Sequence, residues 1–220
     1  MCKSDKGITA IDTHVDDGMG ICLSKEEELK LKAGIQKFYK IKEKDTSKPF
    51  KVLGILVTRD AHHGTLKLSQ AKYIDSILHK FDMTDCNPVL TPVDKGSHLQ
   101  GEGSAVYEDE KCYQALTSSL SYAAMSTHLD IGYITQYLSQ LNKGLTQCDW
   151  NMAKRVLPYL KGMKDLGIVY RRSPKPGGVS QADHVTLWGY CDTNYAEDPR
   201  DQKSASGFIA TGAPRPGGTG

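Results

Sequence analysis

Residues 11–22 read IDTHVDDGMGIC, and this short stretch decides how the N-terminal part of the chain folds. Apolar and polar residues alternate on both sides of the Asp16-Asp17 pair, which is the pattern of two half-buried β-strands. An Asp-Gly step between such strands favours a tight turn, because glycine readily adopts the positive φ that primed turns require. The stretch therefore predicts a hairpin that carries two carboxylates at its tip and is braced by two buried strand faces.

The paired carboxylates suggest a metal site. Adjacent carboxylates repel each other unless a cation or water screens them. Hard divalent cations prefer carboxylate oxygens, so Asp16 and Asp17 suit a magnesium site of the kind used in phosphoryl transfer. On spacing alone, an exposed acidic turn is the commoner alternative. A calcium-binding loop fits poorly, because Thr13, Val15 and Ser24 occupy positions where that loop needs other ligands.

The composition indicates an intracellular protein. The 220 residues suffice for a real core, and the formal net charge of +2 means that any basic surface must be local. The six cysteines are scattered without a C-x-x-C pair, which fits reduced thiols better than a disulfide framework or a zinc site. No apolar run reaches the length of a membrane span. We therefore expect a cytoplasmic or nuclear location and no membrane partner.

A first helix is predicted directly after the hairpin, over residues 24–41. Ser24 and Glu27 form a capping box at its start. The apolar residues that recur at helical spacing include Phe38 and Tyr39, so we expect both rings to line one side of this helix.

The remaining chain combines strands with a helical region. Patterns of period two alternate with patterns of period 3.6, and turn residues separate them. The N-terminal elements are strands over 50–60 and 64–69, then a helix over 70–81 that Ser69 caps. The apolar stripe of this helix is predicted to contain Tyr73, Ile74, Ile77, Leu78 and Phe81. The later elements are two or three helices from about 110 to 163, with breaks near 128–130 and 142–144, then strands over 167–172, 187–192 and 204–212, of which the first two pair.

Six segments follow one another in a distinctive order. They are HVDD (14–17), VLGILV (52–57), LSQAKYIDSILHKFDMTDCNPVLTPVD (68–94), YQALTSSLSYAAMSTHLDIGY (113–133), KRVLPYLKG (154–162) and LWGYCDTNYAEDPRDQKSASGFI (187–209). Together they resemble the polymerase region of copia-type LTR retrotransposons, from the back half of the reverse transcriptase into the start of RNase H. The resemblance extends from about Ile8 to Gly212, and six motifs in register are not a coincidence.

The resemblance implies an α/β fold that contains a partial reverse-transcriptase palm hairpin and thumb, a helical connection and a partial RNase H-like sheet. A Pro- and Gly-rich loop would act as the hinge between the palm and thumb part and the part that contains the helical connection and the RNase H-like sheet. The implied segments are 1–85 (palm hairpin, primer-grip-like hairpin and thumb-like helix), 86–109 (linker), 110–164 (helical thumb or connection), 165–212 (partial RNase H-like domain) and 213–220 (disordered tail).

The resemblance also implies catalytic and metal-binding residues. HVDD occupies the place of the family's Tyr-x-Asp-Asp hairpin, so Asp16 and Asp17 would be palm carboxylates that bind Mg²⁺ or Mn²⁺. His14, which replaces the family's tyrosine, would lie at the primer and nucleotide site. Asp192 would be a metal ligand at the end of the first RNase H strand, and the alternative is an edge-strand aspartate that begins a turn.

Further residues are implied to contact a primer–template of RNA and DNA. Leu53 and Gly54 resemble the segment that grips the primer 3′ end, where glycine allows a close approach to sugar-phosphate. Lys67, Lys72 and Lys80 would track phosphates along the thumb-like helix. The alternative is that these lysines form only the solvated face of that helix.

Departures from the family pattern predict that this chain is inactive alone and binds magnesium weakly or not at all. The family's other palm aspartate and its fingers precede the hairpin, and Asp12 cannot replace that aspartate because it shares a strand with Asp16. The later RNase H carboxylates would also fall outside the chain. THLD (127–130) replaces an Arg-Pro sequence, and Pro158 is expected to kink or break a helix.

Three hypotheses therefore remain open. The chain is a segment of an RNA-directed DNA polymerase from a transposable element that integrates its DNA, completed by other polyprotein segments. Alternatively it is a non-catalytic remnant that binds nucleic acid, or a binding module recruited by the host. Steep salt dependence of binding would indicate nucleic acid, because phosphate contacts release counterions.

Overall fold

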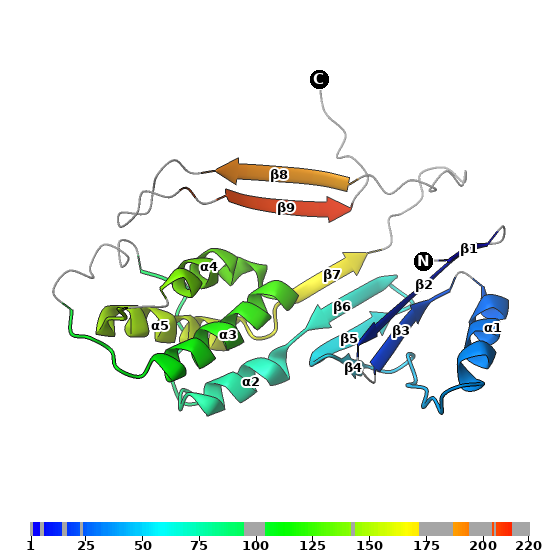
Figure 1. Ribbon diagram of the computed structural model, residues 1–220, viewed down its shortest axis with the longest axis horizontal. Helices are drawn as coiled ribbons and strands as arrows, with labels where there is room; N and C mark the ends of the chain where they lie inside the picture. Colours follow the sequence, from blue (N-terminus) through cyan, green and yellow to red (C-terminus); the bar gives the residue numbers. More distant parts are fainter. Residues whose placement is uncertain are drawn as a thin grey trace, which may run out of the picture. The chain divides into compact units, whose positions relative to one another are not determined.

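The computed structural model describes a mixed α/β protein, as the α/β part of the fold prediction states (Figure 1). Its described residues contain five α-helices and three small antiparallel sheets. The chain divides into one compact unit over residues 1–172 and another over residues 173–220, and each is described by itself. The described residues are 2–4, 7–14, 17–22, 24–94, 104–141, 144–171, 187–193, 204 and 206–212.

The first sheet confirms the predicted hairpin but shifts its turn. His14 pairs with Asp17 and Thr13 pairs with Gly18, so the Asp17-Gly18 step lies in the ladder of paired residues and not in the connection between the strands. The sheet has the order β1-β2-β3, with β1 over Cys2–Ser4, β2 over Gly7–His14 and β3 over Asp17–Ile21.

The two predicted buried faces of this hairpin are not observed. Ile11 lies opposite Gly20, whereas Met19 lies opposite Asp12. Because cross-strand partners share a face, the two large apolar side chains point to opposite sides of the sheet. Ile11 is 46% exposed and Met19 is 45% exposed. The alternation therefore predicts the strands correctly but not their burial, because burying both side chains would require other elements to pack on both faces of this sheet.

Helix α1 (Lys25–Gln36) is shorter than predicted. Its start is as expected, since the Ser24 hydroxyl accepts a hydrogen bond of 3.2 Å from the Glu27 amide. The prediction that Phe38 and Tyr39 lie along this helix is wrong. The amides of both residues donate to the Ile35 carbonyl, each at 3.0 Å, and this tight turn ends the helix before the rings can pack.

The second sheet is antiparallel throughout and has the order β4-β5-β6-β7. The predicted single strand over 50–60 is wrong, because a turn at Leu53 and Gly54 divides it. Ser69 does not cap the next helix, since it is the last residue of β6 and Gln70 is the N-cap. The strands are β4 (Phe50–Val52), β5 (Ile55–Asp60), β6 (Thr65–Ser69) and β7 (Gly167–Arg171).

Strand β7 was predicted to pair with the strand over 187–192, and this pairing is also wrong. In register, Leu68 of β6 lies opposite Ile168 of β7, and Ser69 lies opposite Gly167. Strand β7, which follows the helical region, therefore pairs with β6 and is the fourth strand of the sheet that contains the β4–β5 turn. The sheet and the helices therefore belong to one unit.

The core lies among four helices. Ile74, Ile77 and Leu78 of the predicted stripe are buried, and the helix breaks near 128–130 and 142–144 fall as expected. Tyr113, Leu116 and other apolar residues of the later helices complete the cluster. The helices are α2 (Ala71–Lys80), α3 (Glu110–Ser126), α4 (Gly132–Gln140) and α5 (Gln147–Met163), with a 3₁₀ turn over Leu129–Ile131.

Of the predicted kink or break at Pro158, the break is not observed, because α5 continues through this residue to Met163. Buried neighbours on both sides, Leu157 and Leu160, hold this part of the helix in the core. The Pro158 carbonyl accepts a hydrogen bond of 3.4 Å from the Val89 amide. The described first part of the predicted linker therefore lies along α5, where Lys161 also donates to the carbonyls of residues 84 and 86.

In the described part of the second unit, β8 (Leu187–Thr193) and β9 (Ser206–Gly212) form a hairpin. Its described side chains include Tyr190 and Phe208, which are 69% and 87% exposed. A two-stranded sheet with such exposure is marginally stable alone. In neither unit is a described helix long and apolar enough to cross a bilayer.

Candidate metal and nucleic-acid site

The predicted metal site is the tip of the β2–β3 hairpin. Asp17 is the first residue of β3, directly across the turn from His14, and Asp16 lies outside the described residues. Carboxylates are the donors that magnesium prefers, so the residues at this tip fit that ion in their chemistry. Asp12 is exposed further along β2. Within the described ranges, no three His, Cys, Asp or Glu residues gather into a metal-binding group.

The predicted primer-binding residues form the β4–β5 turn. Leu53 has φ of +49° and Gly54 has φ of +77°, and Val52 pairs with Ile55 across them. Positive φ at both central residues is the pattern of a type I′ turn, for which Asn-Gly is the usual sequence. A bulky side chain in this conformation costs about 1–2 kcal/mol. Because the Leu53 side chain is 43% exposed, its partial burial offsets only part of this conformational cost.

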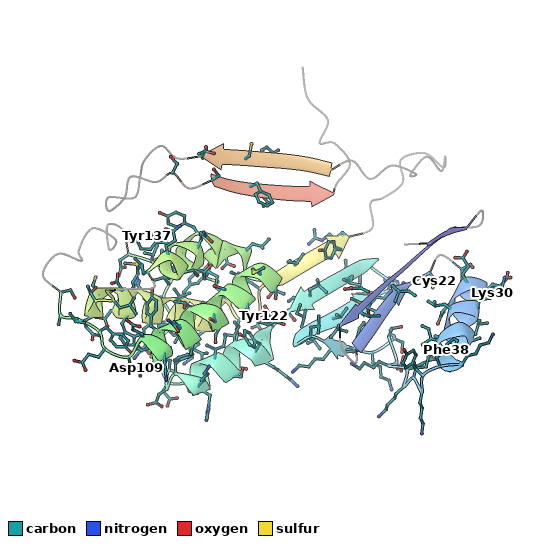
Figure 2. All side chains as sticks on the ribbon, in the orientation of Figure 1. Cys22, Lys30, Phe38, Asp109, Tyr122 and Tyr137 are labelled. Atoms are coloured by element: carbon teal, nitrogen blue, oxygen red, sulfur yellow. The ribbon has the colours of Figure 1, made fainter. Side chains whose placement is uncertain are left out.

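A residue that the sequence analysis missed holds this turn. The hydroxyl of Tyr122, on α3, donates a hydrogen bond to the Leu53 carbonyl (Figure 2). The Tyr122 ring packs edge-to-face on Tyr73 of α2, with 4.9 Å between the ring centroids. The Tyr73 hydroxyl in turn donates to the Ser119 carbonyl at 3.1 Å. Only the helical pattern around Tyr122 was visible in the sequence, and it gave no sign of this distant partner.

An open groove of about 480 Å³ follows one side of α3, and Tyr122 is one of its lining residues. Six of its seven lining residues carry a hydroxyl or amide group, and apolar atoms also form much of its surface. The lining residues are Gln114, Thr117, Ser118, Ser121, Tyr122, Met125 and Ser139.

The three predicted phosphate-contacting lysines differ in their surroundings. Lys67, on β6, donates a hydrogen bond of 2.9 Å to the Asp165 carbonyl. Lys72 is exposed on α2. Lys80, also exposed, lies over the Phe81 ring at 5.2 Å from its centroid. Lys72 and Lys80 therefore remain accessible to a ligand, whereas Lys67 already serves a structural contact.

Asp192 lies in the other unit, one residue before the end of β8. Its carboxylate is exposed and accepts a hydrogen bond of 2.9 Å from the Thr193 amide. Its strand partner is Gly207 of β9. The strand position agrees with the prediction, and the carboxylate makes the local contact of a residue that begins a turn.

The N-terminal part of the chain matches a known protein family. Residues 2–95 match the family described as reverse transcriptase (RNA-dependent DNA polymerase). This range contains the β2–β3 hairpin, the β4–β5 turn and the three lysines. No solved structure matches the chain.

Several transposon proteins are similar to the chain over more of its length. The retrovirus-related Pol polyprotein from transposon TNT 1-94 of Nicotiana tabacum is 28% identical over 214 residues, which cover 94% of this chain and 15% of that polyprotein. The corresponding polyprotein from transposon RE2 of Arabidopsis thaliana is 32% identical over 144 residues, or 66% of this chain and 9% of that polyprotein. The putative transposon Ty5-1 protein of Saccharomyces cerevisiae is 24% identical over 214 residues, or 96% and 66% of the two chains. The chain thus spans only a small part of the two Pol polyproteins.

Proposed function

Because this chain belongs to the reverse transcriptase family of copia-type retrotransposon Pol polyproteins, we propose that it is the part of an RNA-directed DNA polymerase that carries the catalytic hairpin and binds the primer. One observation carries this proposal. The family match over residues 2–95 contains both the Asp16-Asp17 hairpin and the Leu53-Gly54 turn, in the order that the family resemblance implies.

The two predicted sites would have different tasks. Asp16 and Asp17 would hold divalent cations at the hairpin tip, and magnesium bound there would stabilise the charge that develops during phosphoryl transfer. The exposed β4–β5 turn would present backbone to the primer. At its tip, Gly54 leaves space for a close approach, since an added Cβ would meet only the Tyr122 hydroxyl, at 3.4 Å.

We expect the isolated chain to bind a primer–template but not to extend it. Two-metal synthesis needs several converging carboxylates, and only Asp16 and Asp17 are assigned to this site. Binding should weaken steeply with added salt, because lysine–phosphate contacts release counterions. The β8–β9 hairpin with Asp192 would represent the first two strands of RNase H, and we expect it to cleave no RNA by itself.

A primer-extension assay on an RNA template, with magnesium and with manganese, tests this function together with duplex binding measured by fluorescence anisotropy. The expected result is salt-sensitive binding without extension. Extension that is lost in Asp16→Ala and kept in the control Asp12→Ala would overturn the expected inactivity. Absence of duplex binding at low salt would contradict the proposed function and favour a protein-binding module.

A further inference from the structure

Two adjacent aromatic rings are exposed beyond the end of α1. Phe38 is 80% exposed and Tyr39 is 72% exposed, although aromatic side chains usually contribute most to cores and interfaces. Helix α1 ends at Gln36, before either ring. Two exposed rings next to each other in the sequence are a candidate for an interaction site.

The same stretch is strongly basic. Residues 37–51, here called the lysine–aromatic segment, contain six lysines and two acidic residues, a net charge of +4, whereas the whole chain carries +2. The two acids are already engaged, because Glu43 pairs with Lys32 at 2.7 Å and Asp45 accepts from Ser47 at 2.6 Å. A local charge of this size is complementary to a polyanion.

The lysines nearest the rings are available to a ligand. Lys37, Lys40 and Lys42 are exposed, and none of them forms an ion pair with an acidic residue in the described part of the chain. The segment is nevertheless anchored, since its last two residues belong to β4, which pairs with β5, and the Lys44 ammonium donates to the Lys51 carbonyl of that strand at 3.2 Å. Cations and rings therefore occur within a few residues of one another on an anchored segment.

We propose that the lysine–aromatic segment binds single-stranded nucleic acid. Phe38 and Tyr39 stack on successive unpaired bases, while Lys37, Lys40 and Lys42 contact the phosphates. Stacking platforms beside a basic track are the general solution for binding single strands, because every unpaired base has a face to stack on. A duplex cannot satisfy the rings, since its bases are already stacked. This site goes beyond the proposed function, which places the primer at Leu53 and Gly54.

An anionic lipid surface is a less suitable ligand. Interfacial membrane binding needs an amphipathic helix with a broad apolar face, whereas α1 ends before these rings and has no buried apolar residue. Two rings among six lysines offer little apolar area to a membrane. In a polynucleotide, by contrast, the bases can stack on the rings and the phosphates can contact the lysines.

The test uses the full 220-residue chain. Binding of a fluorescein-labelled oligouridylate is measured by anisotropy over a range of salt concentrations, next to a blunt duplex and to vesicles that contain phosphatidylserine. We expect Phe38→Ala with Tyr39→Ala to weaken oligouridylate binding at least about tenfold, since one stacked base contributes about 1–3 kcal/mol. The matched aromatic control is Tyr133→Ala, because Tyr133 is 65% exposed on α4.

A second variant separates charge from stacking. Changing Lys37, Lys40 and Lys42 together to Gln should lower the magnitude of the log–log salt slope by about 2, from three phosphate contacts at about 0.7 each. The matched control changes Lys25 and Lys30 of α1 and Lys111 of α3 together to Gln. Unchanged binding in both test variants, no binding by the unmodified chain, or binding to vesicles alone would each overturn the proposal. If the unmodified chain bound the oligouridylate but not the duplex, only the proposed function would be contradicted.

Discussion

The Tyr122 hydroxyl donates a hydrogen bond to the Leu53 carbonyl, which joins helix α3 to the β4–β5 turn across 69 residues of sequence. Tyr122 also packs edge-to-face on Tyr73 of α2. Two helices of the core therefore support the turn that the family resemblance associates with the primer 3′ end. The position of that turn depends on the helices as well as on its own sheet.

The first prediction concerns this hydrogen bond. Tyr122→Phe removes the donor and keeps the ring, so we expect the free energy of unfolding to fall by about 1 kcal/mol. Urea denaturation measures the loss, and hydrogen exchange should become faster at the amides of residues 53–55. Tyr133→Phe is the control, because that ring is 65% exposed. Equal exchange in the two variants would show that Tyr122 does not hold the turn.

The second prediction concerns the conformation of Leu53. Asn adopts positive φ more readily than Leu and is preferred in type I′ turns. Leu53→Asn, at φ of +49°, should therefore raise the free energy of unfolding by about 0.5–1 kcal/mol. Urea denaturation measures this change. Because few substitutions of an apolar residue stabilise a protein, a gain would be specific support for this turn type. A loss of stability would argue against it.

A third prediction concerns Gly54. Gly54→Ala places a Cβ at φ of +77° and 3.4 Å from the Tyr122 hydroxyl, so we expect a loss of about 1–2 kcal/mol. Gly34→Ala is the control, because Gly34 lies within α1 with nothing within 4 Å of an added Cβ. There the same change should stabilise by about 0.5–1 kcal/mol. The two variants should therefore shift the unfolding midpoint in opposite directions.

Local patterns in the sequence predicted the elements that depend on local physics. The 3.6-residue period identified Ile74, Ile77 and Leu78 as the buried stripe of α2, and Ser24 identified the start of α1. The hairpin over residues 11–22 followed from alternation on both sides of an Asp-Gly step. In each case the decisive interactions lie within a few residues of one another.

Long-range contacts decided what the sequence could not show. The pairing of Leu68 with Ile168 joins strands that are far apart in the chain, and no local pattern indicates which strand is the partner. The Tyr122–Leu53 contact is hidden for the same reason. The end of α1 at Gln36, before Phe38, was also not predicted, because apolar spacing alone does not mark where a helix ends.

The fourth prediction concerns the pH dependence of stability. His128 is fully buried, its Nδ1 lies 3.5 Å from the Asp130 carboxylate, and neither ring nitrogen forms a hydrogen bond within the described residues. Burial lowers the pKa of His128, and Asp130 opposes this only in part. Below about pH 6.5 the unfolded chain binds a proton that the folded chain resists. Stability from this group is therefore complete above that pH and is lost as pH falls toward the folded-state pKa.

Replacing the imidazole should remove this dependence. We expect His128→Asn to have a flatter plot of unfolding free energy against pH between about 7 and 5 than the unmodified chain, whatever its absolute stability. His62→Gln serves as the control, since His62 is exposed in the β5–β6 turn. If His62→Gln flattened the plot equally, the buried imidazole would not be its source.

The last prediction tests the closure of the second sheet by β7. Gly167 lies opposite Ser69, and a Cβ at Gly167 would collide with the Leu68 carbonyl oxygen and lie 3.2 Å from its carbon. Backbone cannot move aside as a flexible side chain can, so Gly167→Ala should lower the free energy of unfolding by about 1–3 kcal/mol. Hydrogen exchange at β6 should become faster in this variant. Gly132→Ala is the control, because nothing lies within 4 Å of a Cβ there. If both variants unfolded at the same urea concentration, β7 would not approach β6 this closely, and the sheet would lack its fourth strand.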